Sequence, residues 1–428
     1  MATINSAVAW PKPGMAYLFH DGKYYRYDLA TGAYEQELTT SAEWPGLHST
    51  APDAALYYGY GKGYFFYGKK YLRFDIPTNK VDWTGTLSAW PGLWTDRVDA
   101  AVNWGNGKIY FFRGNEYSRY DISLDRVDKN YPKTIAGHWP EVWTDRVDAV
   151  LYPGGDYAYF FRDGAYRRFS LPDDTVDESG DVADLYNIAP VPAGMWKPAR
   201  ELTDDQARVL VGYLIEGGHL FLNTPYAGSW QTGISKPALG QNLVIKPAVI
   251  SDTEFQFFQH EHPDILLDNI DQRMVVVLYR LIRWLNASEP SVDLIRHKGI
   301  GHGNGPPTDC HNQGRALDLS GVAGISAGDL YDRDVALHWG NLPVTSGAAM
   351  RLNPTADQLA HDLFRTAFRF GTFECEDNGI GVGNTWPYHD IGETGGRVIH
   401  PDYIDQPPPA KQHRPAHQDH MHMQIGVT

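Results

Sequence analysis

The chain has 428 residues, 42% of them hydrophobic and 21% charged, and a formal net charge of −15. The length predicts two or three globular domains, and the charge argues against DNA, RNA or an acidic membrane surface as a general partner. No apolar run reaches the length of a membrane span. The N-terminus lacks the features of a secretory signal peptide, so we expect synthesis in the cytoplasm, with export by a dedicated secretion or injection system as one route.

The first half of the chain repeats an aromatic pattern four times. A tyrosine followed by two large apolar residues recurs at intervals of 46 to 49 residues. Each triplet precedes a glycine-containing turn and a Tyr-x-Arg-aromatic segment, which predicts a series of hairpins. The triplets occupy 17–19, 64–66, 110–112 and 159–161. Self-similarity at this period, carried by several short strands per repeat, predicts a closed propeller.

These repeats resemble the hemopexin-like repeat over about residues 1–186, on the evidence of the triplets, the Tyr-x-Arg segments and the Asp-Ala openings at Asp53, Asp99 and Asp148. The resemblance implies an all-β, four-bladed propeller, which we assign to residues 1–189, with a central channel that can hold a cation through backbone carbonyls. It also implies docking on a protein or glycan. Haem is not expected, because the histidines of this part share no position in the repeat. Without a cysteine before residue 190, ring closure must depend on packing.

A proline-rich stretch, 190–200, is predicted to be a linker. Beyond it, Thr203 and Gln206 form a capping-box pattern at the start of a helix, and two more helices are expected near 271–284 and 355–370. A strand is expected at 291–297. Together these elements predict an α+β domain over residues 201–428 with a small antiparallel sheet.

Two short motifs in this second domain carry candidate metal ligands. His311 and Asp318 are separated by six residues, with Gly314 permitting a bend between them. Near the C-terminus, residues 419–425 alternate with a period of two, which places His420, His422 and Gln424 on one face of a strand. Two histidines and one carboxylate make a zinc set that leaves a fourth position for water.

The two motifs, in this order, resemble the zinc peptidase group that includes lysostaphin-type endopeptidases, D-Ala-D-Ala carboxypeptidases and Hedgehog. The resemblance implies Zn²⁺ bound by His311, Asp318 and His422. It departs from the carboxypeptidase pattern at Asp309, where serine is usual. By position, Arg296 on the upstream strand is the candidate for binding the substrate carbonyl, with a surface arginine as the alternative.

The general base is left with two candidates. The group's glutamate corresponds to Asp419, whereas strict strand alternation turns His420 toward His422. We hypothesise that Asp419 is the base, which needs a bend or bulge just before His420, and that His420 polarises the substrate. The reversed roles are the alternative.

The sequence thus predicts a zinc-dependent peptidase or amidase that cleaves peptide bonds of peptidoglycan, as a D-Ala-D-Ala carboxypeptidase or endopeptidase, with the propeller as a targeting module. The alternatives are a toxin effector peptidase acting on a host protein and a non-catalytic binding protein with a structural metal. Three further features have open interpretations. Cys310 could pack beside the metal, stay a thiol or bridge to Cys375, and segment 260–262 (His-Glu-His) could bind metal or form an acidic loop. Residues Trp386, Tyr388 and His389 are candidates for a cleft, and His413 and His417 for a solvated loop.

Overall fold

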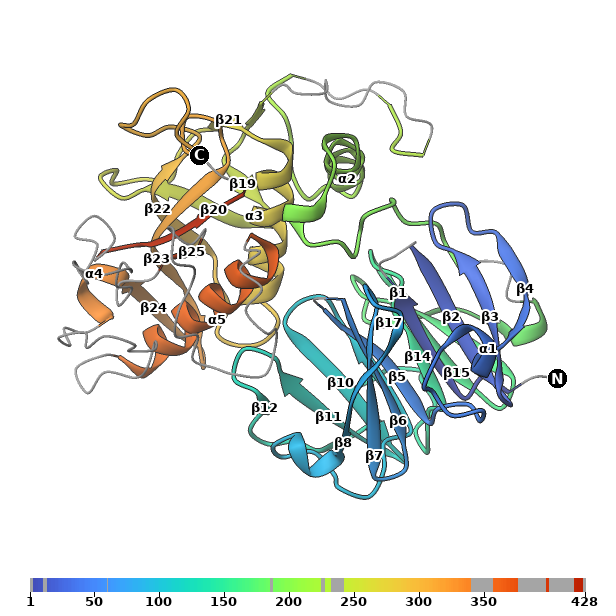
Figure 1. The fold of residues 1–428 in the computed structure, drawn as a ribbon. Coiled ribbons are helices and arrows are strands. Elements are labelled where there is room, and N and C mark those ends of the chain that lie inside the picture. Colours follow the sequence, from blue (N-terminus) through green and yellow to red (C-terminus); the bar gives the residue numbers. More distant parts are fainter. Residues whose placement is uncertain are drawn as a thin grey trace, which may run out of the picture. The chain divides into compact units, whose positions relative to one another are not determined.

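The chain forms two compact units, Met1–Trp196 and Lys197–Thr428, in a computed structural model (Figure 1). The structure describes residues 3–10, 14–59, 61–184, 188–224, 228–231, 242–339, 357–375, 398–399 and 419–425. Trp386, Tyr388, His389, His413 and His417 therefore lie outside the described residues. Within the described ranges, every helix is too short or too polar to cross a membrane.

The first unit contains four antiparallel sheets with the same up-and-down connectivity. Their strands are β1 (Ser6–Trp10), β2 (Met15–His20), β3 (Lys23–Asp28) and β4 (Tyr34–Thr39); β5 (Ala54–Gly59), β6 (Lys62–Tyr67), β7 (Lys70–Asp75) and β8 (Lys80–Thr86); β9 (Ala100–Asn103), β10 (Lys108–Arg113), β11 (Glu116–Asp121), β12 (Arg126–Val127) and β13 (Lys133–Thr134); and β14 (Ala149–Leu151), β15 (Tyr157–Arg162), β16 (Ala165–Ser170) and β17 (Thr175–Asp181). The predicted triplets form the second strand of each sheet. The multi-bladed β domain is confirmed.

The innermost strands of the four sheets form a ring. Strand β1 contacts β5 and β14, and β9 contacts the same two strands from the other side. The space between them is only about 20 Å³ and is lined largely by small residues such as Ala7, Ala55 and Ala101. Cation binding in this channel stays a prediction.

A tryptophan from each of the first three repeats fills the space between neighbouring sheets. Trp44 lies 5.7 Å from Phe19 and 5.5 Å from Phe65, ring centre to ring centre. Trp90 and Trp139 occupy the same position between the second and third and between the third and fourth sheets. Aromatic pairs at these separations stabilise a core beyond the effect of area burial alone. These three tryptophans, each followed by a proline in the sequence, therefore supply the packing that joins the blades.

The interface between the fourth and first sheets is closed by the segment that follows the last blade. Ile188 and Val191 are buried in one cluster with Leu18 and Phe161, and the Val191 backbone N–H donates to the Leu29 carbonyl at 2.6 Å. Ring closure therefore depends on packing and backbone hydrogen bonds, as expected for a unit without cysteine. Part of the stretch predicted as a linker is built into this unit.

Buried ion pairs recur at one position of the blades. In the third blade, Lys108 Nζ lies 2.6 Å from Asp121 and 3.2 Å from Asp128, with both carboxylate side chains largely buried. In the second blade, Lys62 lies 2.9 Å from Asp75, and this lysine is more exposed. Burial alone would raise the pKa of Asp121, but the charge and hydrogen bond of Lys108 more than offset it, so the pKa lies below its usual value.

The substitution Asp121→Asn should lower the free energy of unfolding of the first unit by about 3 kcal/mol at pH 7, because a buried lysine loses its nearest partner. A depressed carboxylate pKa stabilises the fold above the unfolded value near 4, and this contribution is lost as the pH falls. The variant should therefore be less sensitive to acid than the native chain. Denaturant titrations at pH 7 and pH 3.5 measure both effects. The matched control Asp75→Asn should cost about 1 kcal/mol, as for a more exposed pair; equal losses in the two variants would contradict the account.

The second unit contains helices and a mixed sheet. The helices are α2 (Asp204–Glu216), α3 (Gln272–Leu285), α4 (Val335–His338) and α5 (Gln358–Glu374). The sheet has the order β19 (Val249–Ile250), β20 (Thr253–Phe257), β22 (Leu294–Ile300), β23 (Ala316–Ser326), β26 (Met421–Gln424) and β25 (Val398–Ile399), with β24 (Asp329–Asp334) also paired to β23. A small pair, β18 (Leu243–Ile245) and β21 (Leu267–Ile270), lies apart from it. The predicted capping box is present: Thr203 accepts from the Gln206 N–H, and the Gln206 side chain accepts in return.

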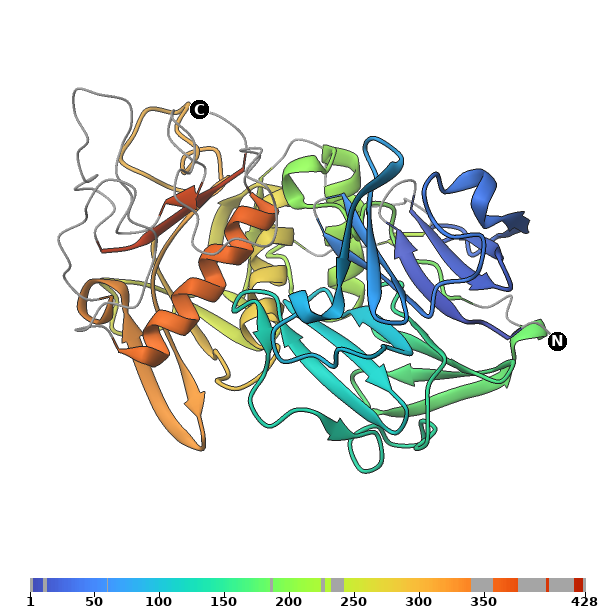
Figure 2. The ribbon, with the colours of Figure 1, turned by 60° about the horizontal axis from the view of Figure 1, so that its bottom comes forward.

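The sheet differs from the expected antiparallel one in a single pairing, since β20 and β22 run parallel. Its centre is otherwise antiparallel, with β23 between β22 and β26. Leu317, Leu319, Met421 and Met423 are completely buried on one face, where α5 covers β25 and β26 (Figure 2). Polar residues that alternate with these apolar ones must project from the opposite face.

Candidate metal centre

Two residues of the predicted zinc set are direct neighbours in the sheet. In the antiparallel pairing of β23 with β26, Asp318 stands opposite His422. Opposite residues of an antiparallel pair project to the same face, with Cβ atoms about 5 Å apart. The apolar residues on either side of each fix the phase, because they are buried beneath α5. The local alternation predicted for both segments is therefore present.

The third residue, His311, comes from the loop between β22 and β23. Asp309 accepts from the His311 backbone N–H at 2.8 Å, so the residue that replaces the usual serine stabilises the turn. Asn312 accepts from the Gly303 N–H at 2.9 Å and donates to the carbonyl of Gly305 at 2.9 Å. Gly314 has a φ of +72° and lies so close to Asn269 that a Cβ would be 2.0 Å from its carbonyl oxygen. These constraints hold His311 in place.

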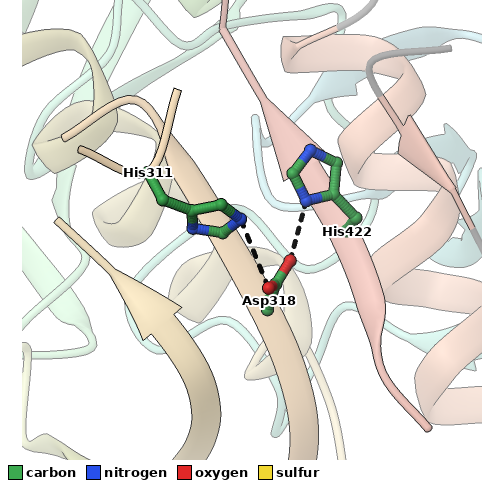
Figure 3. Close-up of side chains that lie close together, drawn as sticks. All are labelled: His311, Asp318 and His422. Atoms are coloured by element: carbon green, nitrogen blue, oxygen red, sulfur yellow. Dashed lines mark hydrogen bonds and ion pairs between the residues drawn. The ribbon is translucent and has the colours of Figure 1, made fainter. Parts of the chain in front are cut away.

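The three side chains converge (Figure 3). His311 Nε2 lies 3.2 Å from one Asp318 carboxylate oxygen, and His422 Nδ1 lies 2.7 Å from the other. One candidate ligand atom from each residue lies within 4.8 Å of the other two, so that among the described residues these three form a group that could hold a metal ion. Two imidazole nitrogens and a carboxylate oxygen are donors that suit Zn²⁺.

Hydrogen bonds prepare His422 for this role. Its Nε2 lies 2.8 Å from Gln424 Oε1, and with Nε2–H donated to that oxygen, loss of the Nδ1 proton that now lies against Asp318 would leave the Nδ1 lone pair for a metal. Such outer partners fix the tautomer of a metal-binding histidine. Nδ1 of His311, by contrast, is buried without a hydrogen-bond partner among the described residues.

The charges of the centre are strongly coupled. Burial raises the pKa of Asp318, but hydrogen bonds from His311 and His422 outweigh burial and hold the pKa far below its usual range. Burial lowers the pKa of His422, whereas the hydrogen bond and charge of Asp318 raise it, and the net shift is upward. The carboxylate is thus ionised, as a metal ligand must be.

The two candidates for the general base occupy different positions. His420 is buried, and its Nε2 lies 3.4 Å from Asp318. Its Nδ1 lies 2.9 Å from Asp419, whose carboxylate also forms an ion pair with Lys298. Burial raises the pKa of Asp419, but the hydrogen bonds and charges of Lys298 and His420 lower it by more, so the net shift is downward. His420 therefore lies between Asp318 and Asp419, with Asp419 farther from the candidate metal centre.

Sequence reasoning missed Lys298. It lies on β22, and its ammonium group also sits 4.6 Å from the ring centre of Phe258. No local pattern marks it, because its partner Asp419 is 121 residues away. The strand prediction that ended at 297 stopped one residue before it.

Arg296, the predicted carbonyl-binding residue, is paired with the Asp332 carboxylate of β24 through both of its terminal nitrogens. Its catalytic role stays a prediction. In segment 260–262, His260 Nδ1 lies 2.8 Å from Asp264, and these residues do not belong to the His311 group. Cys310 and Cys375 are both buried and form no disulfide.

Comparison with known proteins concerns the first unit. A family model described as Hemopexin matches residues 98–144, which include β9 to β13 of the third blade. With the same strand order in the other three sheets, this match supports a hemopexin-like N-terminal part. No curated protein matches the chain.

Several solved structures are similar to part of the chain. The hemopexin fold protein CP4 from cow pea is 22% identical, with a TM-score of 0.39, over 45% of this chain and 100% of that one. The 2S albumin seed protein from Dolichos is 19% identical, with a TM-score of 0.38, over 43% of this chain and 96% of that one.

The substitution His422→Ala should reduce the affinity of the full chain for Zn²⁺ by at least about 100-fold, because one of three ligands is removed. Metal analysis after dialysis against a chelator should find about one zinc per native chain and almost none in the variant. His262→Ala, which removes an exposed histidine outside the cluster, is the control. Full zinc occupancy in His422→Ala would refute the assignment of the centre.

Proposed function

We propose that the chain is a zinc-dependent peptidase that cleaves peptide bonds of peptidoglycan and uses its hemopexin-like unit to dock on a glycan or protein. The observation that carries the proposal is the convergence of His311, Asp318 and His422 beside the hydrogen-bonded pair of Asp419 and His420. The choice of peptidoglycan rests on the resemblance of the two sequence motifs to the zinc peptidase group.

The donor set fits the proposed metal. His422 is buried and the other two residues are partly buried. The carboxylate is ionised, and Gln424 supports the required tautomer of His422. Zn²⁺ held by His311, Asp318 and His422 would lower the pKa of a water molecule and polarise the substrate carbonyl. With three protein ligands among the described residues, the set is typical of catalytic rather than structural zinc, which uses four.

His420 is the residue we assign as general base. With Nδ1–H donated to Asp419, the lone pair of Nε2 is directed toward the centre, where it accepts a proton from the attacking water and returns it to the leaving amine. Asp419 is less suited to this task, because Lys298 pairs with its carboxylate and its pKa is lowered. We therefore reverse the two roles hypothesised from the sequence.

Asp419 and Lys298 then have a positioning role. The carboxylate holds the imidazole of His420 in one orientation and one tautomer, and the ammonium group together with the Phe258 ring holds the carboxylate. A base fixed in this way needs little rearrangement when substrate binds. This arrangement also supports the enzyme over the alternative of a non-catalytic binding protein, which has no need for an oriented imidazole beside its metal.

The substitution His420→Ala should reduce kcat by roughly 100-fold or more while zinc stays bound, as expected when a general base is lost. Asp419→Asn should reduce kcat by only about tenfold, because the side-chain amide oxygen introduced at position 419 can still accept a hydrogen bond from Nδ1–H of His420. Turnover of peptidoglycan fragments, followed by mass spectrometry, gives both rates. If zinc is retained and Asp419→Asn is the more damaging change, Asp419 is the base. If native, zinc-loaded protein releases no product from peptidoglycan, the substrate class is wrong.

A further inference from the structure

A cavity of about 880 Å³ lies near the candidate metal centre, to which two of its lining residues connect it. It lies between the segment 257–268 and the end of β22, and Lys298 and Gly299 belong to its lining. A Cβ at Gly299 would lie 3.1 Å from His311 Nδ1, so the cavity and the His311 ring share this glycine as a wall. Its volume is in the range of small-molecule binding sites.

The wall of the cavity is held by hydrogen bonds. Asp264 accepts through one oxygen from His260 Nδ1 at 2.8 Å and through the other from His297 Nε2, also at 2.8 Å. His297 is only 5% exposed. The side chain of Gln256 donates to the His260 carbonyl at 2.5 Å. These bonds fix the segment onto β20 and β22, so a ligand would enter a preformed site and pay little ordering entropy.

The lining combines apolar surface with negative charge. Apolar contacts are available from Phe257, Pro263, Ile265, Leu266, Leu267 and Ile300. The carboxylates are those of Glu261, Asp264 and Asp268, against one ammonium group, that of Lys298. That ammonium is already paired with Asp419. The four lining imidazoles add positive charge only when protonated.

From this composition we infer that the cavity is a subsite for a substrate residue that carries a protonated primary amine on an alkyl chain, such as lysine. The inference rests on the proposed peptidase function, because the cavity can hold a substrate side chain only if the nearby centre binds that substrate. The alkyl chain contacts the apolar wall, and the ammonium group meets Glu261 and Asp268. Asp268 Oδ1 already lies 2.7 Å from His302 Nε2, so its second oxygen is the one that meets the ammonium group. Asp264 contributes charge only, since both of its oxygens already accept hydrogen bonds.

The test compares two tripeptides that end in D-alanyl-D-alanine and differ only in their first residue, lysine or norleucine. Norleucine has the same alkyl chain without the charge. Calorimetry with the zinc-loaded full chain should show about tenfold tighter binding of the lysine peptide, as expected for two partly exposed ion pairs. The preference should decrease at high salt. It should disappear in the double variant Glu261→Gln/Asp268→Asn and persist in Glu254→Gln, an exposed carboxylate of β20 outside the cavity.

Equal binding of the two peptides by the native chain, or a preference that survives in the double variant, would overturn the subsite. Hydrolysis of the same peptides is measured in parallel, so that the two proposals fail separately. A lysine preference that requires Glu261 and Asp268, without any hydrolysis, supports the subsite and counts against the peptidase. Hydrolysis at equal rates with equal affinities supports the peptidase and overturns the subsite.

Discussion

The antiparallel register between β23 and β26 is the constraint on which the candidate metal centre depends. It places Asp318 opposite His422, although 104 residues separate them. A slip of β26 by one residue would turn His422 into the apolar face beneath α5. That slip would also expose Met423, which is completely buried. The hydrophobic core therefore fixes the register, and the register fixes the donor set.

Once the register is set, the other functional side chains follow from strand alternation. His420 and Gln424 lie two residues to either side of His422, so one approaches Asp318 and the other fixes the tautomer of His422. Strand β22, on the far side of β23 from β26, adds Lys298, which pairs with Asp419 next to His420. His420, His422 and Gln424, the proposed base, the proposed ligand and the partner of that ligand, thus lie on or directly before one short strand. The accuracy of their placement comes from the sheet and its core rather than from the loops around it.

Much of this could be predicted from the sequence because the signals are local. The aromatic repeats, the capping box and the alternation of residues 419–425 each lie within a few residues, and each corresponds to an element found in the structure. What could not be predicted depends on distant partners. The ion pair of Lys298 with Asp419 and the pairing of Arg296 with Asp332 join residues that no local pattern connects. The parallel pairing of β20 with β22 likewise depends on tertiary packing rather than on any local sequence pattern.

Glycine explains how a loop can deliver His311 to this rigid sheet with comparable accuracy. A Cβ at Gly303 would lie 2.8 Å from the Cβ of His311, and one at Gly314 would lie 2.0 Å from a backbone oxygen. The loop therefore packs closer than any other residue allows, and its many hydrogen bonds leave it few alternative conformations. Close packing also occurs at Gly299, which lines the acidic cavity and lies against the ring of His311. A side chain bound in the cavity would therefore be separated from the His311 ring by the backbone of Gly299, a residue too small to keep the two far apart.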